Sequence, residues 1–279
     1  MLDAHADHER ITHLSNEVRF GDAPLAAAVY TVAFLRQMAV PSIAAVVFRG
    51  GHGPIIKDTR TRNDDTLAFF GEFMRCGHSS PRGRAAIERH NEIHAPFSIT
   101  NEQSLYTLGA LTFEVERTSA LLGVQLLSSA EQEANFHFWR GVGEQMGLHD
   151  LHESPQSFWR WTKEHERLTW GHTEGGRAVA EVMIEDLLAR WLPAWLRPLG
   201  RQAVLALCED ALLDVHRLPH PAPGVRAAVR AGTRAYRLAR RLLPDPPDRS
   251  WADHFGAAYG ACPEVANMGY HPRSGGGRR

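Results

Sequence analysis

Hydrophobic residues along this chain recur mainly at intervals of three and four positions, and strand-like alternation is scarce. Two capping boxes, Thr100-x-x-Gln103 and Ser128-x-x-Glu131, mark helix starts, and Ser154-Pro155 marks a third. The pattern predicts an all-α protein. Its expected helices cover residues 23–37, 64–75, 81–94, 100 to about 123, 128–147, 154 onward, 174–191, 200–215 and 223–242.

The chain is expected to form one domain. Prolines cluster near residues 219–223 and 244–247, but no long low-complexity linker separates two self-sufficient cores. A chain of 279 residues can bury a large core. We expect a single-domain, multi-helix bundle over residues 1–273, followed by a Gly- and Arg-rich disordered tail over residues 274–279.

Composition narrows the partners and the compartment. The charges nearly cancel, with 31 basic and 32 acidic residues, so we expect no nucleic-acid partner. Cys76, Cys208 and Cys262 form no CxxC pair and suit a reducing compartment. The first ten residues lack the pattern of an export signal, and the most apolar stretch, residues 25–48, is interrupted by polar residues and a proline. A cytoplasmic protein without a transmembrane segment is the expectation.

The helix expected over residues 223–242 is strongly basic. Its arginines cover a broad face opposite Val229, Tyr236 and Leu243, and such a face can bind an anionic lipid surface or a partner. A solvated face of an amphipathic helix is the commoner explanation, and we favour it, with peripheral membrane contact as the alternative. The arginines are Arg226, Arg230, Arg234, Arg237, Arg240 and Arg241.

The helix expected over residues 81–94 carries the most informative chemistry. Ser80 and Pro81 mark its start, and Pro96 disfavours helical conformation at the residue before it. His90 and His94 lie one turn apart on one face, so at least one imidazole points inward. Imidazole is the commonest protein ligand for transition metals, although a lone inward histidine is more often a hydrogen-bonded core residue.

The spacing of His90 and His94 is also that of a zincin helix. In a zincin, a glutamate directly follows the first histidine and acts as a base, whereas here that position is Asn91. Glu92 lies one residue further round the helix and would project away from a metal-bound water. A zinc hydrolase using His90, His94 and a distant acid is therefore the weaker alternative.

Haem binding requires less of the sequence. It needs one inward neutral imidazole, apolar walls for the porphyrin, and cations or hydrogen-bond donors for its propionates. His94 meets the first requirement, and the aromatic residues of segment 67–73 supply walls. Arg62, Asp65 and Thr66 occupy the expected first turn of the helix over residues 64–75, although plain N-capping by an aspartate there would also explain the acids.

Several motifs follow one another along the chain. They are RFGD (residues 19–22), FLRQMAVPSIA (34–44), RNDDT (62–66), ERHNEIHAPFSITNEQSLYTL (88–108) and FWRGVGEQMG (138–147). In this order they resemble the MpaB oxygenase family, which includes the rubber-cleaving latex clearing proteins, and the similarity is greater to the fungal MpaB-like branch. A weaker similarity continues over residues 259–270.

The resemblance implies an all-helical fold that encloses a pocket for haem b, with His94 as the ligand of the iron. It places the distal polar residues at Arg62, Asp65 and Thr66, and it matches Thr112 to a threonine of the next helix. His90 is counted with the residues that bind the cofactor. Rubber-cleaving relatives carry a lysine at the position of Asp65 and an arginine at that of Asn91, so neither the rubber substrate nor its mechanism transfers.

The expected function is a haem b-dependent oxygenase that uses dioxygen to oxidise or cleave a small, apolar, unsaturated organic substrate. Arg62, Asp65 and Thr66 are the expected catalytic residues, and His94 is the expected metal ligand. The alternative from another class is a non-catalytic helical protein that binds haem or a hydrophobic ligand. Substrate-dependent oxygen uptake separates the two hypotheses, because a carrier shows none.

Overall fold

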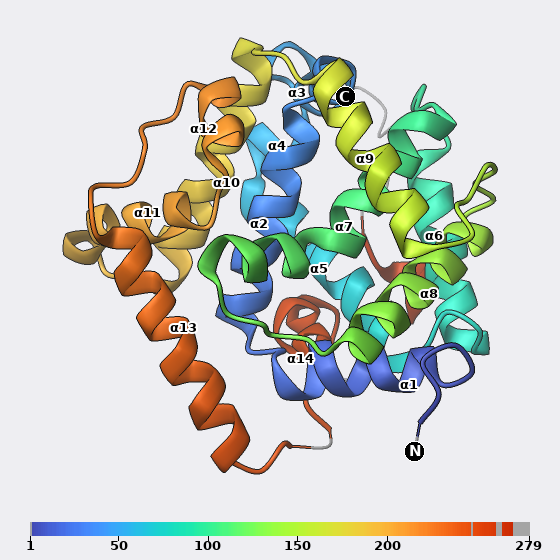
Figure 1. Cartoon of the computed structure of the whole chain (residues 1–279). Coiled ribbons are helices and arrows are strands. Elements are labelled where there is room, and N and C mark those ends of the chain that lie inside the picture. The colour runs from blue at the N-terminus through green and yellow to red at the C-terminus, as the bar shows by residue number, and fades with distance from the viewer. Residues whose placement is uncertain (1, 247, 261–263, 270–279) are drawn as a thin grey trace.

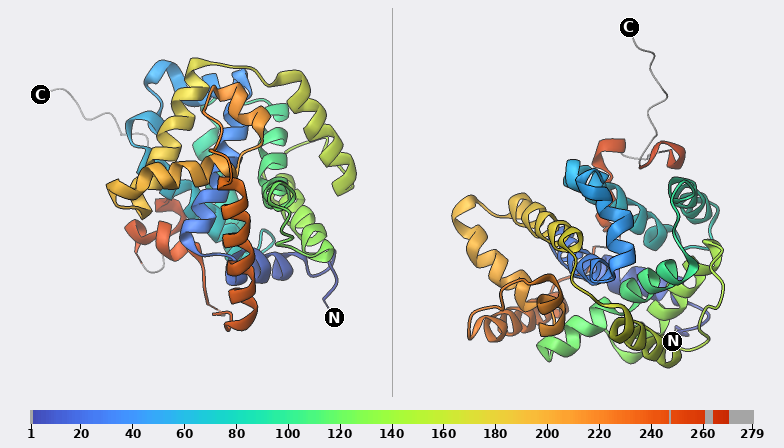
Figure 2. Two further views of the ribbon diagram at one scale, coloured as in Figure 1. Left: turned by 60° about the vertical axis from the view of Figure 1, so that its left-hand side comes forward. Right: turned by 90° about the horizontal axis from the view of Figure 1, so that it is seen from above.

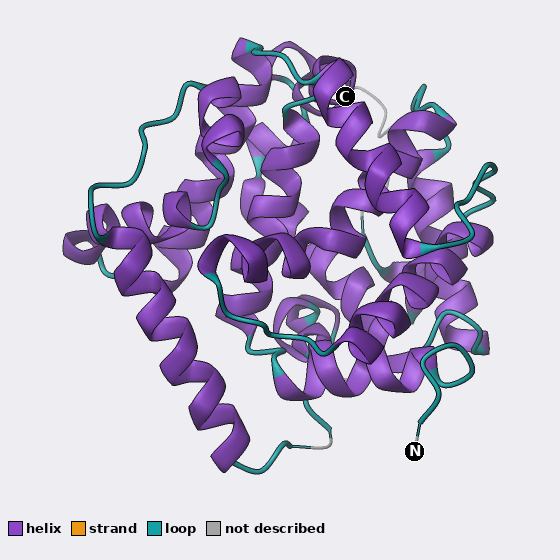
Figure 3. Ribbon diagram, in the orientation of Figure 1, coloured by secondary structure: helices purple, strands orange, loops and turns teal. Residues whose placement is uncertain are grey.

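The computed structural model describes residues 2–246, 248–260 and 264–269, and in these ranges the chain forms helices joined by loops and turns, without a strand (Figure 3). The all-α prediction is thereby confirmed. The tail over residues 274–279, Cys262 and Tyr270 lie outside the described residues, and the single-domain boundaries stay a prediction. The main helices are α1 (His8–Thr12), α2 (Ala23–Met38), α3 (Pro41–Phe48), α4 (Pro54–Lys57), α5 (Thr59–Cys76), α6 (Pro81–His94), α7 (Asn101–Leu122), α8 (Ser129–Gln145), α9 (Pro155–Thr169), α10 (Glu174–Trp191), α11 (Arg197–Ala206), α12 (Asp210–His216), α13 (Val225–Leu242) and α14 (Trp251–Phe255).

Caps set most of the helix boundaries as predicted. The side chains of Thr100 and Ser128 each accept the backbone N–H three residues on, and both capping boxes are complete. Ser80 caps α6 in the same way, and the helix ends at His94 as the proline at position 96 requires. The segments that carry the motifs are therefore rigid elements.

Two boundary predictions were wrong. Residues 200–215 lie in two helices, α11 and α12, instead of one. The N–H groups of Leu207 and Cys208 donate to carbonyls three residues back, and α11 ends there. Each of the two helices places its apolar face in the core. Helix α5 begins at Thr59 rather than at residue 64, since the Asp58 carboxylate accepts the Thr61 N–H. The N-cap is thus neither Asp64 nor Asp65, and Asp65 and Thr66 lie in the second turn.

Helix α2 lies at the centre of the molecule, between α10 and α7 (Figure 1). Its residues 30–38 are buried, as is expected for a helix surrounded by others. Helix α5 packs against α6 and α14, and α1 lies against α8. A π-helix over His13–Arg19 and the short α1, α4 and α14 were not predicted from the sequence.

Helix α13 runs along the outside of the molecule, against α11 and α7 (Figure 2, left). Arg240 is buried and pairs with Asp245, so the arginines do not all belong to a solvated face. Leu243 is 57% exposed at the C-cap and therefore does not lie on the inward face, contrary to the prediction. Leu238 and Leu242 are also exposed, which leaves apolar surface beside the arginines.

In the described residues, no single helix is long and apolar enough to span a membrane. One bent pair, His8–Arg19 followed by Ala23–Met38, meets the length and composition criteria together, with a bend of 113° between its halves.

Candidate functional site

The candidate site lies where α5 packs against α6. His94, in the last turn of α6, donates from Nδ1 to the His90 carbonyl oxygen at 2.8 Å. This bond fixes the neutral tautomer, so Nε2 carries a lone pair, and it has no hydrogen-bond partner among the described residues. Burial, together with the positive charge of Arg62, lowers the pKa of His94, so the imidazole is neutral near pH 7.

His90 lies deeper than His94. Its ring packs edge-on against Phe69 and Phe73 of α5, and its centroid is 4.1 Å from that of His94. Burial lowers the pKa of His90 well below its usual value. The Nδ1 atom of His90 is buried without a hydrogen-bond partner, which is uncommon for a polar atom in a folded protein.

Arg62 and Thr66 lie one turn apart on α5. The guanidinium of Arg62 donates to the hydroxyl of Thr66, and this hydroxyl donates to the Arg62 carbonyl. Arg62 is within electrostatic reach of both His90 and His94, since its charge lowers the pKa of each. The structure therefore places Arg62 and Thr66 near His90 and His94, and their roles in a site stay a prediction.

Asp65 is held by a residue from the far end of the chain. The hydroxyl of Tyr259 donates to the Asp65 carboxylate, and the Gly269 N–H donates to the same hydroxyl oxygen. Burial and the hydrogen bond to Asp65 raise the pKa of Tyr259. Met268 adds a backbone contact to Arg89 of α6, so this segment covers both helices of the site. The site prediction missed Tyr259, although it begins the weak similarity over residues 259–270.

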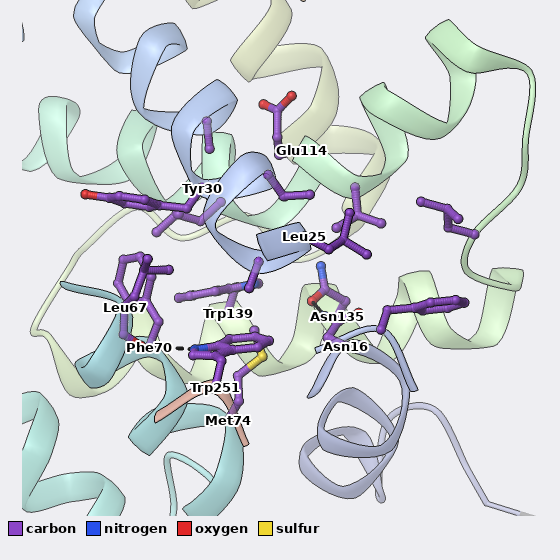
Figure 4. A pocket seen from close by; sticks show the side chains of 17 residues that line it. Asn16, Leu25, Tyr30, Leu67, Phe70, Met74, Glu114, Asn135, Trp139 and Trp251 are labelled. Atoms are coloured by element: carbon purple, nitrogen blue, oxygen red, sulfur yellow. Dashed lines mark hydrogen bonds between the residues drawn. The ribbon is translucent and has the colours of Figure 1, made fainter. Parts of the chain in front are cut away.

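An apolar cavity of about 790 Å³, including its mouth, lies on the other side of α5 (Figure 4). Leu67 and Phe70 of α5 and Tyr30 of α2 form part of its wall, and its few polar groups belong to Asn16, Glu114 and Asn135. The Tyr30 hydroxyl is buried without a hydrogen-bond partner. Burial raises the pKa of Tyr30, while the nearby Arg62 charge and Thr66 hydroxyl act in the opposite direction. Tyr30 thus connects the cavity to the site.

Thr112 is not joined to this group by any described contact. Its hydroxyl donates to the Leu108 carbonyl within α7, and its own carbonyl accepts from Asn135 of α8. Thr112 lies next to Leu111, which lines the cavity, so its match to the family threonine stays a prediction.

A second buried polar cluster, also missed from the sequence, joins α2, α7 and α9. Arg36 is 1% exposed and its Nε lies 2.9 Å from a carboxylate oxygen of Glu114, itself 1% exposed. Arg117 lies 2.8 Å from Glu166, which also contacts Arg36 at 3.6 Å. Burial alone would lower the pKa of Arg36, but the surrounding carboxylates raise it, so the guanidinium is charged. Glu114 thus borders the cavity as a paired anion.

The residues of the site fit a haem. The requirement for a neutral inward imidazole with a free nitrogen is met by His94. Phe69, Phe73 and Ile93 supply apolar surface, and Arg62 supplies a cation. The unpartnered Nδ1 of His90 and hydroxyl of Tyr30 are the kind of buried polar atoms that a bound group or water satisfies.

A third ligand for a zinc site at His90 and His94 is not found among the described residues. The one group of three such side chains in this part of the chain is His8, Glu9 and His78, elsewhere in the fold. The zinc hydrolase alternative at His90 and His94 is therefore without structural support.

A neutral half-buried imidazole, an arginine on the adjacent helix and an apolar cavity thus lie within one all-helical fold. The sequence profile of the family described as "ER-bound oxygenase mpaB/B'/Rubber oxygenase, catalytic domain" matches residues 18–242, and the chain belongs to this family. The resemblance stated from the motifs is thereby confirmed.

Individual relatives are distant. The chain is 23% identical over 230 residues to the "ER-bound oxygenase mpaB'" of Penicillium brevicompactum, covering 77% of this chain and 54% of that protein. It is 24% identical over 196 residues to the "ER-bound oxygenase mpaB" of Penicillium roqueforti (strain FM164), covering 64% of this chain and 65% of the relative. The chain thus spans between half and two thirds of the length of these relatives.

A solved structure of latex clearing protein LCP in the closed state has a similar fold. The TM-score is 0.51 at 18% sequence identity, and the match covers 87% of this chain and 69% of the other. At this identity the likeness concerns the fold alone, and it agrees with the all-helical architecture.

Proposed function

We propose that this protein is a haem b-dependent oxygenase that uses dioxygen to oxidise or cleave a small, apolar, unsaturated organic substrate. The observation that carries the proposal is the imidazole of His94, neutral, half-buried and free at Nε2, within electrostatic reach of Arg62. Membership of an oxygenase family supports the reaction class. Haem b held by His94 would supply an iron that activates dioxygen.

The residues of the chain have distinct roles in this proposal. His94 holds the cofactor, and His90 supports it by accepting its Nδ1–H at the backbone carbonyl. Arg62 and Thr66 supply hydrogen-bond donors and positive charge near the reacting group. Asp65 is bonded to Tyr259, so it is a positioning residue that fixes the C-terminal segment over α5 rather than a free donor or base.

The cavity supports an apolar substrate. Its wall is mostly aliphatic and aromatic, with few polar groups, as is typical of sites for small apolar molecules. Glu114 is neutralised by Arg36, so the cavity presents no unpaired charge from this carboxylate to a ligand. Tyr30 of the cavity wall lies near enough to Arg62 and Thr66 for them to influence its pKa, so an apolar molecule in the cavity would lie close to these residues.

The cofactor assignment is tested by the visible spectrum and haem content of the purified protein. We expect a Soret band in the wild type and loss of most bound haem in His94→Ala, because the iron loses its protein ligand. The matched control is His149→Ala, which removes an exposed histidine and should retain the wild-type spectrum. Full haem content and an unchanged spectrum in His94→Ala would eliminate this residue as the ligand.

Turnover separates the enzyme from the non-catalytic carrier. Oxygen uptake by the haem-loaded protein is measured with unsaturated terpenoids and lipids as probes, and the proposal expects substrate-dependent consumption. Val29→Phe narrows the cavity from α2 without touching Arg62, so it should lower uptake and leave the haem spectrum unchanged. Haem binding without uptake for any probe favours the carrier.

A further inference from the structure

A group of metal-binding side chains lies at the N-terminal end of the molecule, separate from the site between α5 and α6. His8 and Glu9 belong to the first turn of α1, and His78 belongs to the connection between α5 and α6. Nε2 of His8 lies 3.0 Å from Nε2 of His78, and Nε2 of His78 lies 3.4 Å from a carboxylate oxygen of Glu9. The three donor atoms all lie within 4.8 Å of one another.

These separations are close to those of a zinc site. Zinc binds imidazole nitrogen and carboxylate oxygen at about 2.0–2.2 Å in tetrahedral geometry, so two of its ligand atoms lie roughly 3.3 Å apart. The observed 3.0 Å and 3.4 Å lie on either side of this value.

Outer contacts orient two of the three donors. His8 donates from Nδ1 to the His5 carbonyl at 2.6 Å, which leaves a lone pair on Nε2 directed at His78. The Glu9 carboxylate accepts the backbone N–H of Ser79 at 2.7 Å and its hydroxyl at 2.9 Å. Carbonyl and hydroxyl partners of this kind fix the tautomer and direction of metal ligands in known sites.

Two glycines leave the space that these ligands occupy. A Cβ atom at Gly141 of α8 would overlap the imidazole of His78 at Nε2 and Cε1. A Cβ atom at Gly77 would lie 2.7 Å from the Glu9 carboxylate, and Gly77 also has φ +76°, which favours glycine. The imidazole of His78 is therefore seated in a notch of α8, with its Nε2 facing α1.

We propose that His8, Glu9 and His78 bind one zinc ion through two Nε2 atoms and a carboxylate oxygen, with a water as the remaining ligand. Two histidines and one carboxylate are a donor set that zinc accepts in proteins. The ion fastens α1 to the segment that leads into α6, the helix of His94. Zinc binding then stabilises the fold by mass action, because the three ligands are assembled only in the folded chain.

The test uses the full chain with any affinity tag removed, stripped with a chelator and titrated with Zn²⁺. We expect one zinc per chain by elemental analysis and a rise in Tm with zinc. His78→Asn and Glu9→Gln should each weaken the zinc affinity at least about tenfold. Glu9→Gln keeps an amide oxygen for Ser79 and therefore guards against simple misfolding. His149→Asn is the control and should bind zinc like the wild type.

Gly141→Ala sharpens the result, because it leaves all three ligands in the chain and displaces only the His78 ring. It should lose the zinc-dependent rise in Tm. Co²⁺ in the haem-free protein gives a second readout, since a tetrahedral site produces visible absorption that Glu9→Gln should remove. Equal zinc affinity in the wild type and the ligand variants, or no stoichiometric zinc, overturns the proposal. Neither result bears on the haem spectrum, so the two proposals fail independently.

Discussion

Two buried polar clusters of this protein differ in how their groups are neutralised. Around Arg36, cations and carboxylates from three helices lie within ion-pair distance of one another, although Nη1 of Arg36 and two guanidinium nitrogens of Arg117 lack a hydrogen bond. Between α5 and α6, by contrast, the unpartnered atoms belong to neutral imidazoles: Nε2 of His94 and Nδ1 of His90 have no hydrogen-bond partner among the described residues.

Buried polar atoms normally find hydrogen-bond partners, because leaving one unpaired costs about 1–3 kcal/mol. The ion pairs around Arg36 join three helices and compensate one another's charge, so this cluster holds helices together, whereas the unpartnered nitrogens of the neutral imidazoles between α5 and α6 are free to bind a ligand. We therefore expect mutations in the Arg36 cluster to lower stability and mutations in the α5–α6 cluster to weaken ligand binding.

The largest effect is expected for Arg36→Met. Removing one partner of a buried ion pair leaves Glu114 uncompensated, and such changes destabilise proteins by about 3–5 kcal/mol. Urea unfolding measures the loss. The control is Arg167→Met, which breaks an exposed pair with Glu164 and should have no measurable effect. A similar stability for both variants would show that the Arg36 cluster is not structural.

A smaller effect, on binding alone, is expected for Arg62→Leu. The haem-loaded variant should bind azide about 10- to 100-fold more weakly, because a cation within electrostatic reach of His94 is removed. Arg62→Lys should recover part of the affinity. Titration followed by the Soret band gives the constants. Unchanged azide affinity together with a large loss of stability would show that Arg62 stabilises the fold instead of acting on the bound ligand.

Tyr259→Phe should cost about 1–2 kcal/mol, because the buried Asp65 carboxylate loses a hydroxyl donor. Asp65 has further contacts, so the loss is smaller than for Arg36. The measurement is urea unfolding with the haem removed, so that cofactor binding does not add to the stability. An equal stability of the variant and the wild type would mean that this hydrogen bond does not hold the C-terminal segment.

The smallest effect concerns pH and a buried histidine that is bound to a backbone carbonyl. His216 is buried, and one ring nitrogen contacts the Leu35 carbonyl at 2.8 Å. Burial lowers the pKa of His216 below the value of about 6.5 expected in the unfolded chain. The fold therefore favours the neutral form, and the stability linked to it is present above pH 6.5 or so and is lost as the pH falls.

His216→Gln keeps a donor for Leu35 but does not titrate, so its free energy of unfolding should depend less steeply on pH between about 6.5 and 5. The comparison is made by urea unfolding at several pH values. If the free energy of unfolding depends on pH equally steeply in the variant and the wild type, other groups cause the loss of stability in acid.

Local signals predicted most of the long helices. The capping boxes at Thr100 and Ser128 and the proline after Ser80 are readable because a cap and its helix are neighbours in sequence. The break between α11 and α12 was missed because Leu207 and Cys208 carry no glycine or proline signal. It is decided by tertiary packing, which no short window contains.

The same distinction applies to the site. His90 and His94 are one turn apart, and Arg62 and Thr66 are one turn apart, so each pair is visible in the sequence and in the family motifs. Tyr259 reaches Asp65 across 194 positions, and no periodicity shows such a contact. The pair of His8 and His78, separated by 70 positions, is hidden for the same reason.

The segment around Tyr259 and Met268 also bears on where this chain can be shortened. The family profile ends at residue 242, yet Asp65 and Arg89 make contacts with residues beyond that point. A recombinant fragment cut to the profile limits would keep the motifs but uncover a buried carboxylate and the outer surface of α6. Expression of this chain within such boundaries would yield a protein that lacks the cover of its own candidate site.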